Sequence, residues 1–146
     1  MAISDTREVD IDATPAEILD VIADVESTPE WSSAQQRVEV LDRHDDGRPR
    51  QVKMTVKSVG ITDDQVVSYR WGDNTVSWSL VSAGQLKAQD ATYTLTPRGG
   101  QTHVRFDLAV DPLVPLPGFL LKRALKGAMD TATDGLRTRV MTLKKG

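Results

Sequence analysis

From Arg37 to about Val110 apolar and polar residues alternate, and turn residues interrupt the alternation at intervals of roughly 8–12 residues. A period of two is typical of strands that bury one face, and regular turns between such strands are typical of an antiparallel meander. The pattern therefore predicts six consecutive antiparallel strands. Their inward faces are predicted to carry Val38 and Val40, then Val52, Met54 and Val56, then Val67, Tyr69 and Trp71, then Val76, Trp78 and Leu80, then Ala91, Tyr93 and Leu95, and finally Val104, Phe106, Leu108 and Val110.

The segment before this meander carries one more strand and two helix signals. Residues 7–11 alternate like the later strands. In Thr14-Pro15-Ala16-Glu17 a threonine that can cap a helix precedes a proline at the first helical position, and the glutamate can complete a capping box. A helix is therefore predicted to begin here and to end near residues 25–26. Thr28-Pro29 repeats the cap-then-proline signal and predicts one further short helical turn that carries Trp31.

After the meander the chain changes from strand to helix. Three prolines between residues 112 and 117 predict a stiff extended crossing. From about Phe119 to Leu143 apolar residues recur at helical spacing, and about 25 residues at 1.5 Å each give a helix on the order of 37 Å long, which can cross a small sheet. Its inward stripe is predicted to contain Leu121, Leu125, Ala128, Ala132, Leu136, Val140 and Leu143.

Composition narrows the classes of function. The 146 residues suit one domain spanning residues 1–146, and 39% hydrophobic residues are enough for one core. A formal charge of −3 gives no positive field for nucleic acid, and with no cysteine and two isolated histidines we expect neither a metal site nor a cofactor. The sequence has no apolar run of about 18 residues and no signal-peptide pattern, so we expect a cytoplasmic protein without stable membrane insertion.

The order of these elements resembles the START-like or Bet v 1-like (SRPBCC) superfamily, in particular its small bacterial proteins of polyketide cyclase/dehydrase type. Local similarities are the run V-D-I-D-A-T-P-A-E-I with D-V-E-S-T-P-E-W, ending at Trp31, and the run L-T-P-R-G-G-Q-T-H-V from Leu95 to Val104. The resemblance covers essentially the whole chain. It implies an α+β helix-grip fold, in which a seven-stranded curved antiparallel sheet wraps around the long C-terminal helix and two short helices lie between strands 1 and 2. It also implies a ligand cavity between the sheet and the helix.

Small residues on the long helix support such a cavity independently. Ala128 and Ala132 lie on the inward stripe, with Ala124 and Gly135 beside them, where a densely packed helix would carry larger side chains. Glycine costs helix stability relative to alanine, which points to a steric reason for Gly135. The alternative is a close approach of helix and sheet across small residues, with no void between them.

Ligand contacts are predicted from the inward strand positions and the helix stripe. Trp78, Tyr93 and Phe106 lie at the centres of three consecutive strands and can form an aromatic wall, although ordinary core packing explains them equally well. A buried Tyr93 hydroxyl needs a hydrogen-bond partner, which a ligand oxygen can supply. Trp31 and Trp71 are predicted to lie at the rim or to pack. The predicted ligand-binding residues are Met54, Tyr69, Trp78, Tyr93, Phe106, Leu121, Leu125, Ala128, Met129 and Ala132.

Lys122, Arg123 and Lys126 cluster in the first turns of the long helix, where positive charge opposes the helix dipole. One interpretation is attraction of an anionic head group, a carrier protein or a membrane surface to the mouth of the cavity, with Phe119 and Leu120 as an apolar lip. The other is an ordinary solvated helix face. Transient membrane contact therefore stays open.

No catalytic residue is predicted. His44 lies in an acidic hairpin, and His103 alternates outward from its apolar neighbours, so neither histidine is placed to activate a nucleophile. Arg70 and Arg105 also fall on the outer face. Asp90, just before the inward run around Tyr93, is the only carboxylate selected as a candidate acid or base.

Three functions remain. The favoured one is the binding and carrying of a small hydrophobic ligand, such as a lipid, a quinone or a polyketide, by a monomer or a homodimer. The second is a polyketide aromatase/cyclase or dehydratase that acts on a ligand in the same cavity and needs at least one Arg, Asp or Tyr pointing into it. The third is a protein-interaction module with a filled core.

Overall fold

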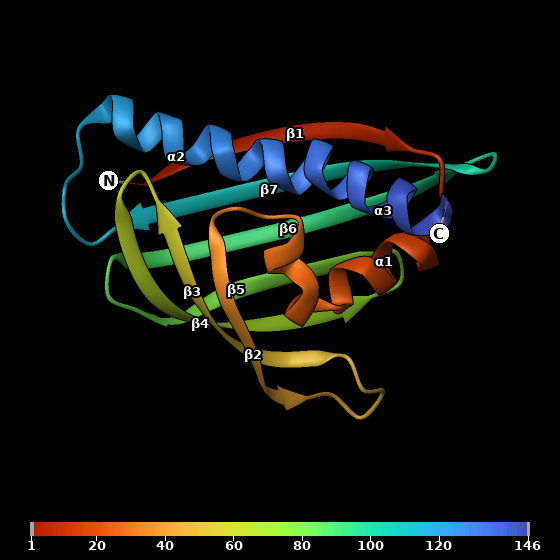
Figure 1. Cartoon of the computed structure of the whole chain (residues 1–146), viewed down its shortest axis with the longest axis horizontal. Coiled ribbons are helices and arrows are strands. Elements are labelled where there is room, and N and C mark those ends of the chain that lie inside the picture. The colour runs from red at the N-terminus through yellow and green to blue at the C-terminus, as the bar shows by residue number, and fades with distance from the viewer. Residues whose placement is uncertain (1, 146) are drawn as a thin grey trace.

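Seven antiparallel strands and a long C-terminal helix form the architecture, as predicted (Figure 1). The computed structural model describes residues 2–145. The strands are β1 (Ile3–Ile11), β2 (Gln35–Arg43), β3 (Pro49–Ser58), β4 (Ile61–Gly72), β5 (Thr75–Ala83), β6 (Leu86–Arg98) and β7 (Gln101–Pro112). Their order in the sheet is β1-β7-β6-β5-β4-β3-β2, so the last six form a meander and β1 pairs with β7 at one edge.

Alternating burial confirms the strand pattern. Along β7 every second residue is buried, namely Thr102, Val104, Phe106 and Leu108. Gly99 and Gly100 both have positive φ and close the hairpin between β6 and β7, because glycine adopts this conformation without steric cost. β1 begins at Ile3, earlier than the predicted start at Arg7, since its polar first residues still pair with β7 as far as Val110.

The predicted capping box is present at the start of α1 (Pro15–Ala23). The Thr14 hydroxyl accepts a hydrogen bond from the Glu17 backbone N–H at 3.2 Å, and the Glu17 carboxylate accepts one from the Thr14 N–H at 2.9 Å. These two side chains thereby satisfy two backbone N–H groups at the start of the helix. The helix ends at Ala23, slightly before the predicted end.

The second short helix, η1 (Val25–Glu30), is a 3-10 helix that begins three residues before Thr28. The prediction that this turn starts at the Thr28 cap is therefore wrong. Val25, the first residue of η1, is buried, and only Asp24 separates η1 from the end of α1. Trp31 follows η1 immediately, and its backbone N–H donates to the Thr28 carbonyl at 3.0 Å.

The long helix contains 28 residues in three segments, α2 (Gly118–Asp130), η2 (Thr131–Gly135) and α3 (Leu136–Lys145). The middle segment is π-helical, which the uniform helical spacing did not predict. A π turn holds about one residue more than an α turn, so it shifts the face that the helix presents to the sheet. The buried residues of the three segments are Leu121, Met129, Ala132, Thr133, Leu136 and Val140.

The predicted helix stripe is wrong at one position, Leu143. Ala128 faces inward as predicted and lines the cavity described below, although it is classed as exposed, whereas its neighbour Met129 is fully buried. Leu143 is 50% exposed in the last turn of α3, and the helix pattern alone does not indicate where the sheet beneath it ends.

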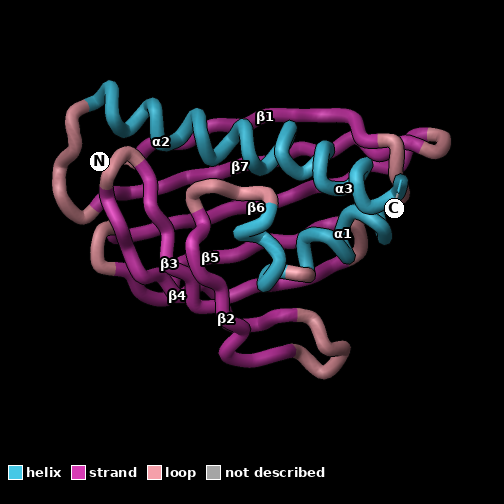
Figure 2. The backbone as a smooth tube through the Cα atoms, viewed as in Figure 1, coloured by secondary structure: helices cyan, strands magenta, loops and turns pink. Residues whose placement is uncertain are grey.

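At one end of the sheet, α1 contacts α3 and both helices contribute to the packed core. Figure 2 shows these two helices side by side near the C-terminus, with the loop that joins β7 to α2 at the opposite end of the molecule. Leu136 and Val140 of α3 and Ile18 of α1 all belong to this core. The space beneath α2 is filled less completely, and there the candidate site is found.

Candidate ligand-binding cavity

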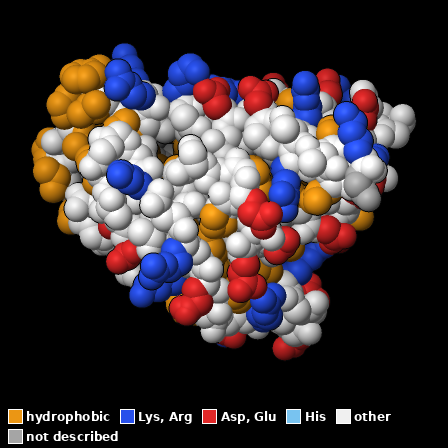
Figure 3. Space-filling model, in the orientation of Figure 1, with side chains coloured by type: hydrophobic (Ala, Val, Ile, Leu, Met, Phe, Trp, Pro, Cys, Tyr) orange, Lys and Arg blue, Asp and Glu red, His pale blue; other side chains and the backbone are white. Residues whose placement is uncertain are grey.

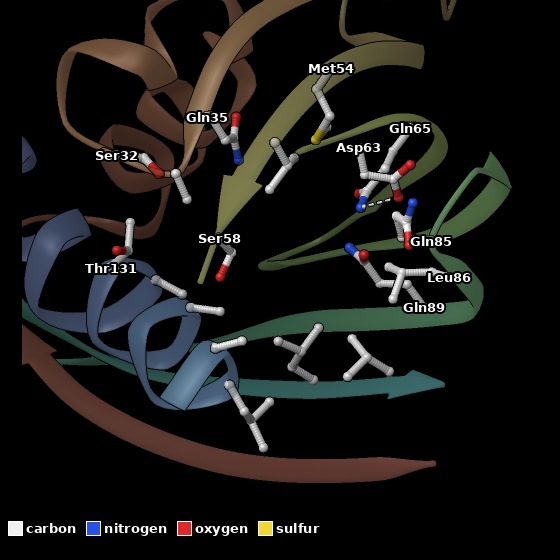
Figure 4. A pocket seen from close by; sticks show the side chains of 18 of the residues that line it. Ser32, Gln35, Met54, Ser58, Asp63, Gln65, Gln85, Leu86, Gln89 and Thr131 are labelled. Carbon is white, nitrogen blue, oxygen red and sulfur yellow. Dashed lines mark hydrogen bonds between the residues drawn. The ribbon is translucent and has the colours of Figure 1, made fainter. Parts of the chain in front are cut away.

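A cavity of about 290 Å³ lies between the first part of the long helix and the sheet. Its sheet wall comes from β2 to β7, and η1 and the segment before α2 contribute further residues. Figure 4 shows its lining side chains between the sheet and the helix. The helix residues that line it are Leu121, Ala124, Leu125, Ala128, Thr131 and Ala132. All of them belong to α2 or η2. The first part of the long helix therefore lines the cavity, whereas α3 packs in the core.

Nine of the ten residues predicted to contact a ligand line this cavity. They are Met54, Tyr69, Trp78, Tyr93, Phe106, Leu121, Leu125, Ala128 and Ala132. Met129 is the exception. Its side chain is fully buried in the core and does not line the cavity.

Four aromatic rings form a continuous wall across β4 to β7. Trp78 pairs with Tyr69 across the β4–β5 ladder, and the two ring centroids are 5.1 Å apart. Trp78 lies 5.8 Å from both Tyr93 and Phe106, and the latter two are 4.5 Å apart. These tilted arrangements fall within the range in which aromatic pairs attract one another. The predicted aromatic wall is thus present and is itself well packed.

The remaining two tryptophans have different roles. Trp71 stacks on Tyr69 at 5.7 Å, donates its indole N–H to the Pro49 carbonyl at 2.8 Å and carries the Arg48 guanidinium over its ring, so it packs outside the cavity. Trp31 lines the cavity. A Cβ added to Gly135 would meet the Trp31 ring at 3.7 Å, which is ordinary contact. The predicted steric need for glycine at this position is therefore wrong.

The two tyrosine hydroxyls of the wall differ in their partners. The Tyr93 hydroxyl donates a hydrogen bond of 2.8 Å to the backbone carbonyl of Ala132, within the π-helical segment. The Tyr69 hydroxyl has no hydrogen-bond partner among residues 2–145, although Tyr69 is only 6% exposed. Burial raises the pKa of both phenols, and for Tyr93 the neighbouring Tyr69 raises it further. Both hydroxyls therefore stay protonated and can donate.

A polar cluster occupies another part of the wall. Asp63 is 8% exposed, and its carboxylate accepts hydrogen bonds from the Gly84 backbone N–H at 2.8 Å and from the Gln65 side chain at 3.2 Å. Figure 4 shows Gln85 and Gln89 on the same side of the cavity as this pair. The cavity is therefore amphipathic, with an aromatic part and an amide and carboxylate part.

The sequence does not predict this cluster as a site, although it carries a signal for it. Asp63 lies two alternation steps and Gln65 one alternation step before Val67, a predicted inward residue of the same strand. Gln89 likewise lies one alternation step before Ala91. Asp90, the predicted candidate acid or base, is exposed on the opposite face of the sheet and does not line the cavity.

The small helix residues do leave space, so the alternative of a tightly closed helix–sheet contact is wrong. Ala124, Ala128 and Ala132 all face the cavity, and no side chain of residues 2–145 fills it. The filled core that a pure protein-interaction module would have is likewise absent from residues 2–145.

One end of the molecule carries exposed apolar residues beside positive charge. Leu113, Val114 and Phe119 are 52%, 56% and 66% exposed. Figure 3 shows hydrophobic side chains gathered where α2 begins, with Lys and Arg side chains next to them. Val114 also lines the cavity, so this surface adjoins it. Of the predicted basic cluster, Lys126 forms an ion pair with Asp130 at 2.7 Å, whereas Lys122 and Arg123 are exposed.

The other candidate groups lie away from the cavity. His103 is on the outer face between Glu8 and Asp10, as its outward alternation predicted. His44 contacts the Tyr69 backbone carbonyl at 3.0 Å and does not line the cavity. Within residues 2–145 no three His, Asp or Glu side chains gather closely enough to hold a metal ion. None of the helices in this range is long and apolar enough to span a membrane.

Known structures share this architecture over nearly the whole chain. A START superfamily protein from Mycobacterium smegmatis is 23% identical, with a TM-score of 0.86 over 96% of this chain and 98% of that one. A protein from Thermus thermophilus is 20% identical, with a TM-score of 0.82 over 97% of this chain and 99% of that one. The ZhuI aromatase/cyclase from a Streptomyces species is 9% identical, with a TM-score of 0.83 over 97% and 94%. These similarities establish the helix-grip fold.

The sequence itself carries the family assignment. No curated protein matches the chain. The profile of the family described as "Polyketide cyclase / dehydrase and lipid transport" matches residues 2–141. Because this match covers nearly all of the sequence, the chain belongs to the polyketide cyclase/dehydrase and lipid transport family.

Proposed function

We propose that the chain, as one domain over residues 1–146, binds and carries a small hydrophobic ligand in the cavity beneath α2. The observation that carries this proposal is a space of about 290 Å³ whose wall combines aliphatic side chains with four packed aromatic rings. Sites for small molecules are typically concave, largely apolar and furnished with a few polar groups. The family description, which names lipid transport, agrees with this class of ligand.

Burial of apolar surface supplies most of the affinity. A ligand that buries about 200 Å² of apolar area gains about 5 kcal/mol before the costs of ordering it are subtracted. The four rings are held by one another and by the Tyr93–Ala132 hydrogen bond, so the wall needs little rearrangement on binding. Preorganisation of this kind lowers the cost of binding.

The test fills the cavity from the helix side. The double variant Ala128→Leu/Ala132→Leu adds bulk at two lining positions, and Thr138→Leu adds similar bulk at an exposed position of the same helix as the control. We expect the wild type and the control to bind the uncharged fluorescent probe N-phenyl-1-naphthylamine and to release an apolar ligand on extraction from the native host. The double variant should do neither.

The opposite result has a clear meaning. If the wild type binds no probe and yields no ligand in native mass spectrometry, and the double variant is more stable than the wild type, the cavity is only an underpacked core. That outcome rejects the carrier function.

A second candidate is an aromatase/cyclase or dehydratase, which the buried Asp63 carboxylate and the unpartnered Tyr69 hydroxyl favour because they give the cavity a proton acceptor and a donor. Incubation of the protein with the ligand extracted from its host separates the two functions. A carrier returns the ligand unchanged, whereas an enzyme gives a rearranged product or one lighter by a molecule of water. Asp63→Asn should abolish such conversion while the ligand still binds.

The surface beside the cavity suggests how a ligand reaches it. Leu113, Val114 and Phe119 are exposed next to Lys122 and Arg123, a combination that suits transient contact with an anionic membrane. Vesicle cosedimentation with and without anionic lipid, compared between the wild type and Phe119→Ser, tests this contact. Equal sedimentation in all four measurements argues against it.

A further inference from the structure

We propose that Asp63 selects the ligand by its polar end: the cavity takes ligands that end in an alcohol or an amine and discriminates against ligands that end in a carboxylate or a phosphate. This inference rests on the proposed binding function and assigns the chemical class of the ligand. Within the described part of the chain, Asp63 is the only charged side chain that lines the cavity, and the lining contains no Lys, Arg or His.

The hydrogen bonds of Asp63 leave room for a further donor. A carboxylate has about four acceptor positions. The Gly84 N–H occupies one position on Oδ1, and the Gln65 amide occupies one on Oδ2. Asp63 is more than nine-tenths buried, and the acceptor positions that remain have no donor within residues 2–145. Buried acceptors are normally paired, and a ligand hydroxyl or ammonium group supplies the missing donor.

The groups around Asp63 can adapt to a ligand. The side chains of Gln85 and Gln89 line the same part of the cavity and make no hydrogen bond to any described residue (Figure 4). An amide can turn to donate or to accept. These two side chains can therefore accommodate the oxygen of an alcohol or the N–H groups of an amine while Asp63 accepts.

The layout of β4 sets the orientation and length of the ligand. Asp63 and Tyr69 lie on the same face of this strand, six residues apart, which corresponds to about 20 Å along the strand. The apolar body of an elongated ligand can lie against the ring of Tyr69 and its aromatic neighbours while its polar end meets Asp63. An anionic end in the same place would face a like charge with no cation in the wall.

The experiment compares three ligands with the same twelve-carbon chain, dodecanol, dodecylamine and dodecanoate, below the concentrations at which they form micelles. Each is titrated against the protein loaded with N-phenyl-1-naphthylamine, and displacement of the probe reports affinity. We expect dodecanol and dodecylamine to bind at least about 10–100-fold more tightly than dodecanoate, the range that a hydrogen bond to a charged group supplies.

Two variants locate the effect. Asp63→Asn removes the charge with little change of shape, and we expect it to strengthen dodecanoate binding and to weaken dodecylamine binding, so that the difference largely disappears. Asp90→Asn makes the same change of net charge on the outer face of the sheet and should leave the ranking as it is in the wild type.

The outcomes distinguish a failure of ligand selection by Asp63 from a failure of ligand binding in the cavity. If the wild type binds dodecanoate as tightly as dodecanol, or if Asp90→Asn changes the ranking as much as Asp63→Asn, the selection by Asp63 is overturned while ligand binding stands. If neither the probe nor any of the three ligands binds, both the carrier function and the selection are overturned. The wild-type ranking decides the point even if Asp63→Asn does not fold.

Discussion

The Tyr93 hydroxyl of β6 and the Ala132 carbonyl of the π-helical segment are joined by a hydrogen bond of 2.8 Å that ties the sheet to the long helix beside the cavity. Tyr93 is 3% exposed and the interaction is buried. A bond of this kind is worth about 1 kcal/mol net, and a buried group that loses its partner costs at least as much. The contact thus fixes how the helix lies over the aromatic wall.

Tyr93→Phe should lower the free energy of unfolding by about 1 kcal/mol, because it removes the hydroxyl that donates to the Ala132 carbonyl. Tyr69→Phe is the matched control, since its hydroxyl has no partner among the described residues. Urea unfolding monitored by tryptophan fluorescence measures both. Equal effects of the two substitutions would contradict the role given to the hydrogen bond.

Gly135→Ala should raise the free energy of unfolding by about 0.4–1 kcal/mol, because alanine restricts the unfolded chain and its Cβ has space. That Cβ would meet Thr131 Cγ2 at 3.6 Å and the Trp31 ring at 3.7 Å, both ordinary contacts. Gly84→Ala is the contrasting variant and should destabilise, since its Cβ would lie 3.0 Å from Asp63 Oδ1. A destabilised Gly135→Ala protein would mean that the π-helical segment needs glycine.

Thr14→Ala should lower the free energy of unfolding by about 1 kcal/mol, because it removes the hydroxyl that accepts the Glu17 N–H at the start of α1. Thr14→Ser keeps a hydroxyl in the same place and should stay within a few tenths of a kcal/mol of the wild type. Thermal unfolding followed by circular dichroism compares the three proteins. A similar loss in both variants would assign the effect to the threonine methyl group instead of the cap.

His103 should make stability depend on pH. Its Nε2 lies 2.8 Å from Glu8 and its Nδ1 lies 2.7 Å from Asp10, and these carboxylates raise the pKa of His103 above its ordinary value of 6.5. A raised pKa in the folded state means that the protonated imidazole stabilises the fold. This stabilisation is fully present below about pH 6.5 and is lost as the pH rises through the folded-state pKa.

The test compares the wild type with His103→Gln by urea unfolding at about pH 5.5 and about pH 8.5. We expect the wild type to be more stable than His103→Gln and the difference in their free energies of unfolding to be larger at the lower pH. The increase should be no more than about 1 kcal/mol, because His103 is near the surface. A stability difference that is the same at both pH values, or larger at the higher pH, would contradict the ion pairs of His103.

The parts of the fold that local chemistry determines were predicted from the sequence. The Thr14 and Glu17 capping box needs only neighbouring residues, and the two-residue alternation of the strands needs only a sheet with one buried face. The π-helical segment was not predictable in this way. It depends on tertiary partners such as Tyr93, which lies 39 residues before Ala132 in the chain.

The candidate site was predicted on its apolar side and missed on its polar side. Nine of the ten predicted contacts line the cavity, because apolar residues at inward positions are recognised easily. Asp63 and Gln65 occupy inward positions of the same strand, but a polar residue in an alternating pattern normally marks a strand end or an outer face. Met129 was misplaced for another reason, since the helix register depends on contacts that spacing does not reveal.

The strict alternation of β4 separates two surfaces that a single strand supplies. Asp63 and Gln65 are buried at the cavity, whereas Thr62 and Asp64, which alternate with them along the strand, are exposed to solvent. One substitution on the inner set can therefore change which ligands are accepted while the outer surface, with its charge and its solubility, stays the same. Ligand preference can therefore change during evolution without a change in the charge or the solubility of the outer surface.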